Sequence, residues 1–103
     1  MEVSALVKAF RKNLEDAGYK WRDASERFEA GRSIMEFQRT KVIDKEGNEI
    51  ASCVWNFSKV DGWTTGHSYG WPELIECWMA PFKSEPEPMT VDEIIKALGD
   101  TNE

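Results

Sequence analysis

Histidine and cysteine are scarce in this chain, which has one histidine, His67, and two cysteines, Cys53 and Cys77. One imidazole and two widely separated thiols do not supply the four ligands of a zinc site, and no Asp/Glu spacing resembles a calcium loop. Two cysteines are also too few for a disulfide framework. We therefore expect neither a metal nor another cofactor, and we expect both cysteines to be small core residues within strands.

Long apolar runs are also missing. No segment approaches the roughly 18 residues that a membrane span needs. The first residues, Met1 to Ser4, are acidic and then amphipathic, unlike a cleavable secretory signal. The proportions of hydrophobic residues (41%) and charged residues (31%) are typical of an ordinary globular protein. These features predict a cytoplasmic protein of one domain that does not enter a membrane.

Positive charge is sparse in the second half of the chain. Residues 42–103 hold four Lys/Arg against twelve Asp/Glu, whereas residues 1–41 hold nine against seven, and the net charge is −6. Binding nucleic acid through its phosphates requires a concentrated basic face, so direct nucleic-acid binding is not expected. The acidic balance favours a protein partner that has a basic surface.

Hydrophobic periodicity predicts a helix near each end. In residues 3–17 the apolar residues recur at helical spacing, and Gly18 supplies the left-handed stop. This apolar stripe consists of Val3, Leu6, Val7, Phe10 and Leu14. A second helix is expected over residues 91–98, because Thr90 and Glu93 form a capping box. Gly99 is expected to end it, and residues 100–103 are expected to fray.

Three strands are predicted between the helices, over residues 33–44, 49–60 and 73–80. Alternation places Met35 and Phe37 on one face of the first strand and Gln38 and Thr40 on the other. A turn over residues 44–48, with Gly47 at a positive-φ position, joins the first two strands into a hairpin. Residues 19–21 would add a short edge strand. Residues 22–32 and 61–72 are predicted as loops, and residues 83–88 as an extended linker.

The predicted fold class is therefore α+β, in two layers and in the order α-β-β-β-α. Two amphipathic helices cover an antiparallel sheet of three strands, or of four with residues 19–21. Double-stranded-RNA-binding domains share this order, but their second helix must be basic to meet phosphates. The final helix here carries Asp92, Glu93 and Asp100 against Lys96 alone, so RNA binding of that kind is not expected.

Aromatic residues concentrate in residues 55–82, which hold seven of the twelve. Trp55 and Trp78 fall in predicted strands and are assigned to the structure. The glycine-rich loop contains Trp63, His67, Tyr69 and Trp71. Its rings would stack a planar ligand or fill a pocket of a partner. Alternatively, they fold inward and cap the open face of a small sheet. Both interpretations stay open.

His67 also allows an enzymatic hypothesis, because Asp61 and Cys77 lie near it in the sequence. A nucleophile needs an orienting context such as a strand–turn–helix elbow, whereas Cys77 lies in the middle of a predicted strand. No catalytic residue is therefore assigned, and we expect a protein that is not an enzyme.

A group of short motifs within residues 33–98 resembles small accessory proteins of bacterial phages and prophages. They are Arg39-Thr40, Asp44 with Gly47-Asn48, Tyr69-Gly70, Leu74 with Glu76 and Trp78, and Met89-Thr90 with Glu93-Ile94. The resemblance implies a context and no activity: such accessory proteins often act by binding, including as inhibitors of host defence.

The leading hypothesis is a small binding protein whose partner is another protein. Its contacts would be the aromatic loop and an acidic surface formed by Glu85, Glu87, Asp92 and Glu93, which would occupy a basic groove on the partner. The alternative from another class is a small-ligand or nucleotide-binding protein that stacks a planar ligand on the loop aromatics. In that case a homo-oligomer would complete the pocket.

Overall fold

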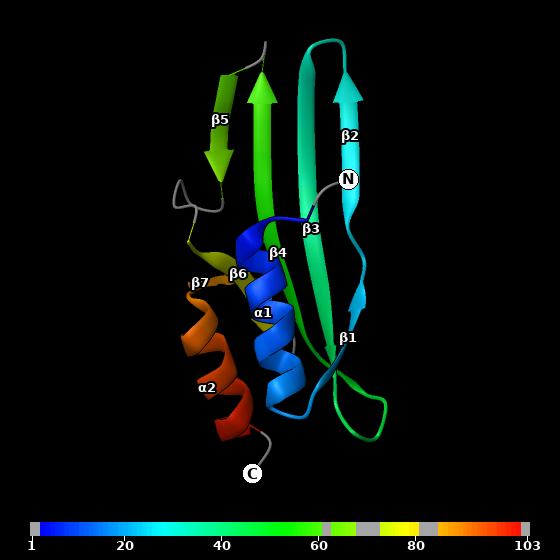
Figure 1. The fold of residues 1–103 in the computed structure, drawn as a ribbon, viewed down its shortest axis with the longest axis vertical. Coiled ribbons are helices and arrows are strands. Elements are labelled where there is room, and N and C mark those ends of the chain that lie inside the picture. Colours follow the sequence, from blue (N-terminus) through cyan, green and yellow to red (C-terminus); the bar gives the residue numbers. More distant parts are fainter. Residues whose placement is uncertain (1–2, 61–62, 68–72, 81–84, 102–103) are drawn as a thin grey trace.

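The computed structural model describes residues 3–60, 63–67, 73–80 and 85–101. It describes the side chains of these residues except those of residues 57–60, 63–67, 100 and 101. The elements in chain order are α1 (Ala5–Asp16), β1 (Lys20–Asp23), β2 (Glu26–Ala30), β3 (Ser33–Ile43), β4 (Glu49–Val60), β5 (Trp63–His67), β6 (Ile75–Met79), β7 (Glu87–Met89) and α2 (Val91–Thr101). The described chain is thus an α+β fold of two helices and a mostly antiparallel open sheet (Figure 1).

The sheet follows the path β1-β3-β4-β6-β7, with β2 also paired to β3 and β5 also paired to β4. β1 and β2 keep one register along β3, from Lys20 opposite Ile43 to Ala30 opposite Ser33. They therefore form one edge strand that is interrupted between Asp23 and Glu26. A register shift next to Val42 in β3 leaves one extra residue in β4, as in a β-bulge.

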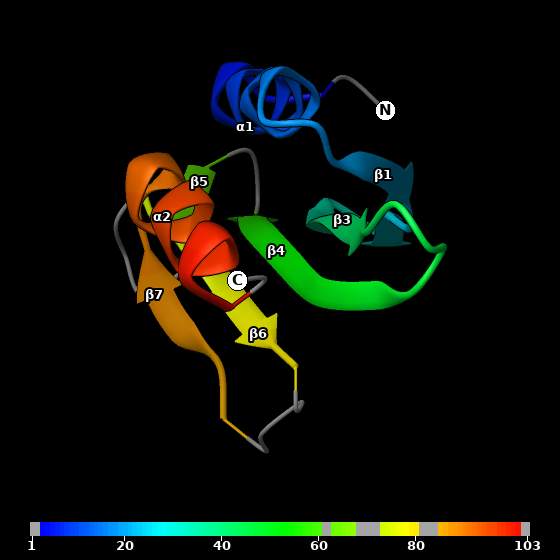
Figure 2. The same ribbon diagram turned by 90° about the horizontal axis from the view of Figure 1, so that it is seen from below.

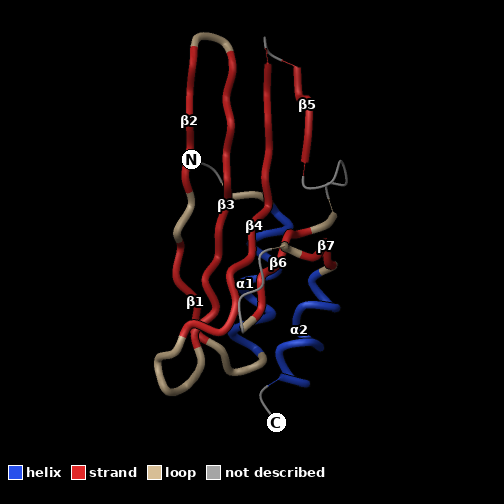
Figure 3. The backbone as a smooth tube through the Cα atoms, turned by 180° about the vertical axis from the view of Figure 1, so that it is seen from behind, coloured by secondary structure: helices blue, strands red, loops and turns tan. Residues whose placement is uncertain are grey.

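The upper part of the sheet extends beyond both helices (Figures 1 and 3). The molecule is accordingly elongated, with extents of 46 × 22 × 22 Å. A strand of the length of β3 spans roughly 36 Å at about 3.3 Å per residue, so the long β3–β4 hairpin sets this dimension. We call β2 together with residues 33–37 of β3 the projecting arm.

Both helices lie on the same side of the sheet, which we call its inner face (Figure 2). The core between helices and sheet consists of Val7, Phe10, Leu14, Val42, Ala51, Cys53, Trp55, Ile75, Cys77, Ile94 and Leu98. Burying a large apolar side chain contributes about 1.5–3 kcal/mol, so this cluster is the main stabilising feature of the fold. We call the opposite side of the sheet its outer face.

Short-range hydrogen bonds fix the start and the end of α1. The Ser4 side chain accepts a hydrogen bond from the Val7 N–H, which caps the helix at its N-terminus. At the other end Gly18 has φ +89°, and its N–H and that of Tyr19 bond to the carbonyls of Glu15 and Leu14. This is a Schellman motif, the arrangement for which a glycine stop is suited.

The capping box of α2 is present. The Thr90 N–H donates to Glu93 Oε1 at 3.0 Å, and the Glu93 N–H donates to Thr90 Oγ1 at 3.2 Å. The predicted end of this helix is wrong, because α2 continues through Gly99 to Thr101. Gly99 is not among the glycines with positive φ, so it does not form the left-handed stop that was expected.

The sheet has more strands than the three or four predicted. Residues 22–32 are not a loop but contain the end of β1 and all of β2, residues 63–67 form β5, and residues 87–89 form β7. Each of these segments is at an edge or at an end of the sheet, where neither face has to be apolar. The periodic signal that identifies half-buried strands is therefore weak there.

The burial of β3 also differs from its apolar pattern. Gln38 and Thr40 are buried beneath α1, whereas Met35 is 47% exposed on the outer face. Polar side chains can lie on the inner face because α1 brings hydrogen-bond partners to them, among them Arg11.

Candidate functional site

The residues predicted for the aromatic loop are only partly described. Trp63 and His67 are the first and last residues of β5, where the backbone pairs with Val60 and Phe57 of β4. Nothing is described of the Trp63 and His67 side chains, and Tyr69 and Trp71 lie outside the described residues. The open question of whether these rings cap the sheet or face a partner is therefore not decided.

The predicted acidic residues lie on and around β7 and the first turn of α2. Glu85, Glu87 and Asp92 are exposed. Glu93 is exposed as well, but its carboxylate serves the capping box, and the hydrogen bond from the Thr90 N–H holds the pKa of Glu93 below its ordinary value. Three of the four acidic residues thus remain as candidates for contacts with a partner.

A small groove adjoins two of these carboxylates. It has a volume of about 230 Å³. Its lining includes Trp78, Met79, Glu85, Glu87, Met89 and Ala97. Pockets for drug-sized ligands usually measure roughly 300–1,000 Å³, so the groove is small for a planar ligand of nucleotide size.

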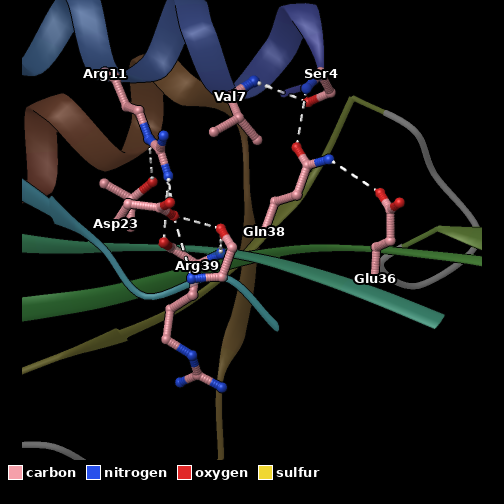
Figure 4. Close-up of polar contacts among 9 residues, drawn as sticks. Ser4, Val7, Arg11, Asp23, Glu36, Gln38 and Arg39 are labelled. Carbon is pink, nitrogen blue, oxygen red and sulfur yellow. Dashed lines mark hydrogen bonds and ion pairs between the residues drawn. The ribbon is translucent and has the colours of Figure 1, made fainter. Parts of the chain in front are cut away.

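Arg11 forms the centre of a polar cluster between α1 and the sheet (Figure 4). Its side chain is almost buried, and it donates from Nε to Thr40 Oγ1 at 2.9 Å and from Nη2 to Asp23 Oδ1 at 2.9 Å. The guanidinium also lies 4.4 Å from the centroid of the Trp21 ring. Arg11 therefore ties the helix to β1 and β3 at once.

The interruption of the edge strand uses the same cluster. Ser25 Oγ donates to Asp23 Oδ1 at 2.5 Å and accepts from the Arg39 N–H at 3.2 Å, in place of a backbone partner. The hydrogen bond from Ser25, followed by that from Arg11, holds the pKa of Asp23 below its ordinary value. A serine hydroxyl and a carboxylate lie together here, as they do in some active sites, but their hydrogen bonds hold β1 against β3.

The two thiols meet in the core. Cys53 and Cys77 are directly opposite each other on β4 and β6, with Sγ–Sγ 3.0 Å, and both are buried and free. The hydrogen bond between them, together with burial, raises the pKa of Cys53 well above its ordinary value. A thiol in this environment stays protonated at neutral pH, which makes it a poor nucleophile.

The outer face of the arm carries exposed apolar side chains. Phe28 is 54% exposed and Met35 is 47% exposed, and they are opposite each other on β2 and β3. The Phe37 ring packs edge-on against that of Phe28, with centroids 6.0 Å apart. Both helices lie on the inner face (Figure 2), so no described helix covers this side of the arm.

The same face continues along β3 to Arg39 and across β4 to Trp78 of β6. The Arg39 side chain points away from α1 (Figure 4), donates to Ser52 Oγ at 3.2 Å and lies 6.0 Å from the centroid of the Trp78 ring. Trp78 is half-buried, whereas Trp55 is in the core. Trp78 is thus part of a surface, although its place in a strand indicated a structural role. We call Phe28, Met35, Phe37, Arg39 and Trp78 the outer stripe.

Part of this surface was detectable in the sequence. Gly31-Arg32 separates two segments that each hold an apolar residue at alternate positions, which is a signal for a hairpin with a two-residue loop. Assigning that hairpin would have placed Phe28 opposite Met35. Trp78 offers no such signal, because its exposure depends on which face the helices cover.

Comparison of the chain with protein-family models, with curated proteins and with solved structures finds no significant match. Among the described residues, neither helix is long and apolar enough to cross a membrane. In the same part of the chain, no group of three or more His, Cys, Asp and Glu side chains is arranged to hold a metal ion.

Proposed function

We propose that the protein works by binding another protein, and that the outer stripe makes the principal contacts. The observation that carries the proposal is the exposure of Phe28 and Met35 on a sheet face that no described helix covers. Apolar side chains grouped on a surface mark interaction sites more often than single exposed ones do. Aromatic residues and arginine, which recur in the outer stripe, are also the types that dominate the energy of protein interfaces.

The polar groups of the described part support binding over catalysis. Arg11, Asp23 and Ser25 hold strands and helix together through their mutual contacts. The Cys53 thiol is buried against Cys77 and its pKa is raised. Reactive cysteines instead have a lowered pKa and some exposure.

The acidic segment suggests the chemistry of the partner. Glu85, Glu87 and Asp92 are exposed around α2, where Lys96 is the only basic residue of the described segment 85–101. Because Glu85 and Glu87 line the same groove as Trp78, a partner with a basic surface next to an apolar patch would meet these two carboxylates and the outer stripe together. The resemblance to phage accessory proteins, which often act by binding, agrees with this proposal.

The test compares capture of partners by the wild type and by a Met35→Glu variant from an extract of the host cell, with quantification by mass spectrometry. The matched control is Ala9→Glu, which adds the same charge at an exposed position of α1. The proposal expects a protein that is captured by the wild type and by Ala9→Glu but is strongly depleted with Met35→Glu. Equal capture by all three proteins would remove the outer stripe from the interface.

Salt dependence tests the acidic contribution separately. Binding of the captured partner should weaken as ionic strength rises, because salt screens attraction between exposed charges. The Debye length is roughly 10 Å at 0.1 M salt. Substituting Glu85, Glu87 and Asp92 by glutamine or asparagine should flatten that dependence. An unchanged salt dependence would remove these three carboxylates from the interface.

A further inference from the structure

The edge strand β2 is open along its length. All five of its residues are exposed, and among the described strands it pairs with β3 alone. Edge strands of this kind template the addition of another strand, and proteins usually protect them with proline, charged side chains, bulges or short length. β7, at the other end of the main path, has only three residues and Pro88 in the middle. β2 has five residues and no proline, and its charged residues Arg27 and Glu29 form an ion pair within the chain.

The register identifies which backbone groups face outward. The Ala24 N–H donates to the Arg39 carbonyl, so at this position the edge strand directs its hydrogen-bonding groups toward β3. Alternate residues of an antiparallel strand bond to the same neighbour, and the register is unbroken from β1 to β2. The N–H and C=O groups of Arg27 and Glu29 therefore point away from the sheet.

We propose that two copies of the chain associate through antiparallel pairing of their β2 strands, about a two-fold axis at Phe28. A pairing of identical edges by a two-fold axis is antiparallel, and the outward-facing residues 27 and 29 must bond to outward-facing residues of the second copy. For an axis at or between the outward-facing residues of β2 itself, three registers satisfy this, with the axis at residue 27, 28 or 29.

Charge selects among the three registers. An axis at Arg27 would place two arginines opposite each other, and an axis at Glu29 would place two glutamates opposite each other. With the axis at Phe28, each Arg27 lies opposite Glu29 of the second copy. Opposite charges stabilise cross-strand pairs and like charges destabilise them. The sequence Glu26-Arg27-Phe28-Glu29-Ala30 is thus self-complementary in one register.

The same register buries an exposed aromatic residue. The Phe28 ring, 54% exposed in the single chain, would lie next to Phe28 of the second copy on the outer face. The T-shaped contact between Phe28 and Phe37 within each chain would flank that pair. Cross-strand aromatic pairs of this kind add to sheet stability.

The shape of the molecule permits the pairing. Because the arm projects beyond both helices, a second arm running in the opposite direction would place its own helices beyond the far end of the first arm (Figures 1 and 3). The result is a continuous sheet across two copies, with the outer stripes of both on one face. This inference does not rest on the proposed partner.

The test is sedimentation velocity on purified Arg27→Glu and Glu29→Arg variants, alone and mixed. Either variant alone places like charges opposite each other twice, and its Kd for self-association should rise on the order of tenfold relative to the wild type. In an equimolar mixture each new charge meets an opposite one, so heterodimers should form with near wild-type affinity. Glu29→Pro should be monomeric with its fold retained, because it removes an outward N–H and the carboxylate opposite Arg27 of the second copy but no hydrogen bond to β3.

The control variants are Lys45→Glu and Glu46→Arg, which reverse charge in the exposed turn between β3 and β4 and should leave association unchanged. Circular dichroism confirms that each variant is folded. A wild type that stays monomeric at concentrations up to about 1 mM would overturn the proposal. So would a dimer that persists in Glu29→Pro, or a mixture of the two charge variants that fails to associate. These measurements involve the purified chain alone, so their failure leaves the capture experiment with a partner unaffected.

Discussion

Replacing Arg11 by methionine tests the polar cluster between α1 and the sheet. The variant keeps an unbranched stem but removes the bonds to Thr40 Oγ1, to Asp23 Oδ1 and to the Arg39 carbonyl. Thr40 is 1% exposed, so its hydroxyl loses its partner without gaining water. An unsatisfied buried polar group costs about 1–3 kcal/mol.

The other contacts of Arg11 contribute less. The side chain of Asp23 is 55% exposed, so its ion pair with Arg11 is worth about 0–1 kcal/mol. The contact with the Trp21 ring adds about 0.5–1 kcal/mol. We expect Arg11→Met to lower the free energy of unfolding by about 2–4 kcal/mol in total. For a chain of this size that lowers Tm by about 10–25 °C.

A double-mutant cycle separates the hydrogen bond from the loss of packing. Thr40→Val removes the acceptor of Arg11 Nε with little change of shape. Replacing both partners by apolar groups can be nearly neutral, so Arg11→Met/Thr40→Val should be more stable than the sum of the single effects predicts, by about 1 kcal/mol. Urea unfolding followed by tryptophan fluorescence measures all four proteins. An Arg11→Met protein whose free energy of unfolding lies within about 0.5 kcal/mol of the wild type would show that this cluster does not stabilise the fold.

Three further predictions concern the helix cap, acid stability and the thiols. Thr90→Ala should lower the free energy of unfolding by about 0.5–2 kcal/mol through loss of the α2 cap, and unchanged urea unfolding would contradict the capping box. The folded-state pKa of Asp23 is lowered, so its contribution is present above its ordinary pKa of 3.8 and is lost as pH falls through the lowered value. Asp23→Asn should therefore show a shallower decline in stability below that pH, and a decline as steep as that of the wild type would speak against the shift. Because burial and Cys77 raise the pKa of Cys53, iodoacetamide at about pH 8 should leave the native protein unmodified and alkylate both cysteines in urea. Fast labelling of the native protein, read by mass spectrometry, would contradict the buried pair.

The segments with strong local signals were predictable from the sequence. The hairpin of β3 and β4 has long alternating strands around a turn in which Gly47 adopts φ +88°. The cap of α2 rests on two residues three positions apart, and both of its hydrogen bonds form. Such signals are local, so they do not depend on the remainder of the fold.

The edges of the sheet and the polar inner face were not predictable in the same way. β2 has no covered face, so burial does not enforce a strong alternation there, and Phe28 and Ala30 are its only periodic signal. Gln38 and Thr40 read as surface residues because their partners, the Ser4 N–H and the Arg11 guanidinium, come from a helix more than 25 residues away. A polar residue can be buried only where the tertiary fold supplies its hydrogen-bond partners, and the sequence of one strand does not show those partners.

The candidate binding residues in the structure differ from those indicated by the sequence, again because exposure depends on the tertiary fold. The sequence directed attention to Trp63, Tyr69 and Trp71, of which no side chain is described, whereas the exposed apolar residues of the described part are Phe28 and Met35. Their exposure follows from the projection of the arm beyond the helices. Periodicity alone assigned Met35 to an apolar face without showing that this face is open.

Site-specific photo-crosslinking shows directly whether the outer stripe contacts a protein partner. A photoreactive amino acid is placed at position 35 and, as a control, at position 9 on the exposed side of α1, and each protein is irradiated in the host cell. We expect a crosslink from position 35 to a protein other than this chain, and no such product from position 9. If position 35 gives no crosslink above the position 9 control, the outer stripe does not contact a protein partner.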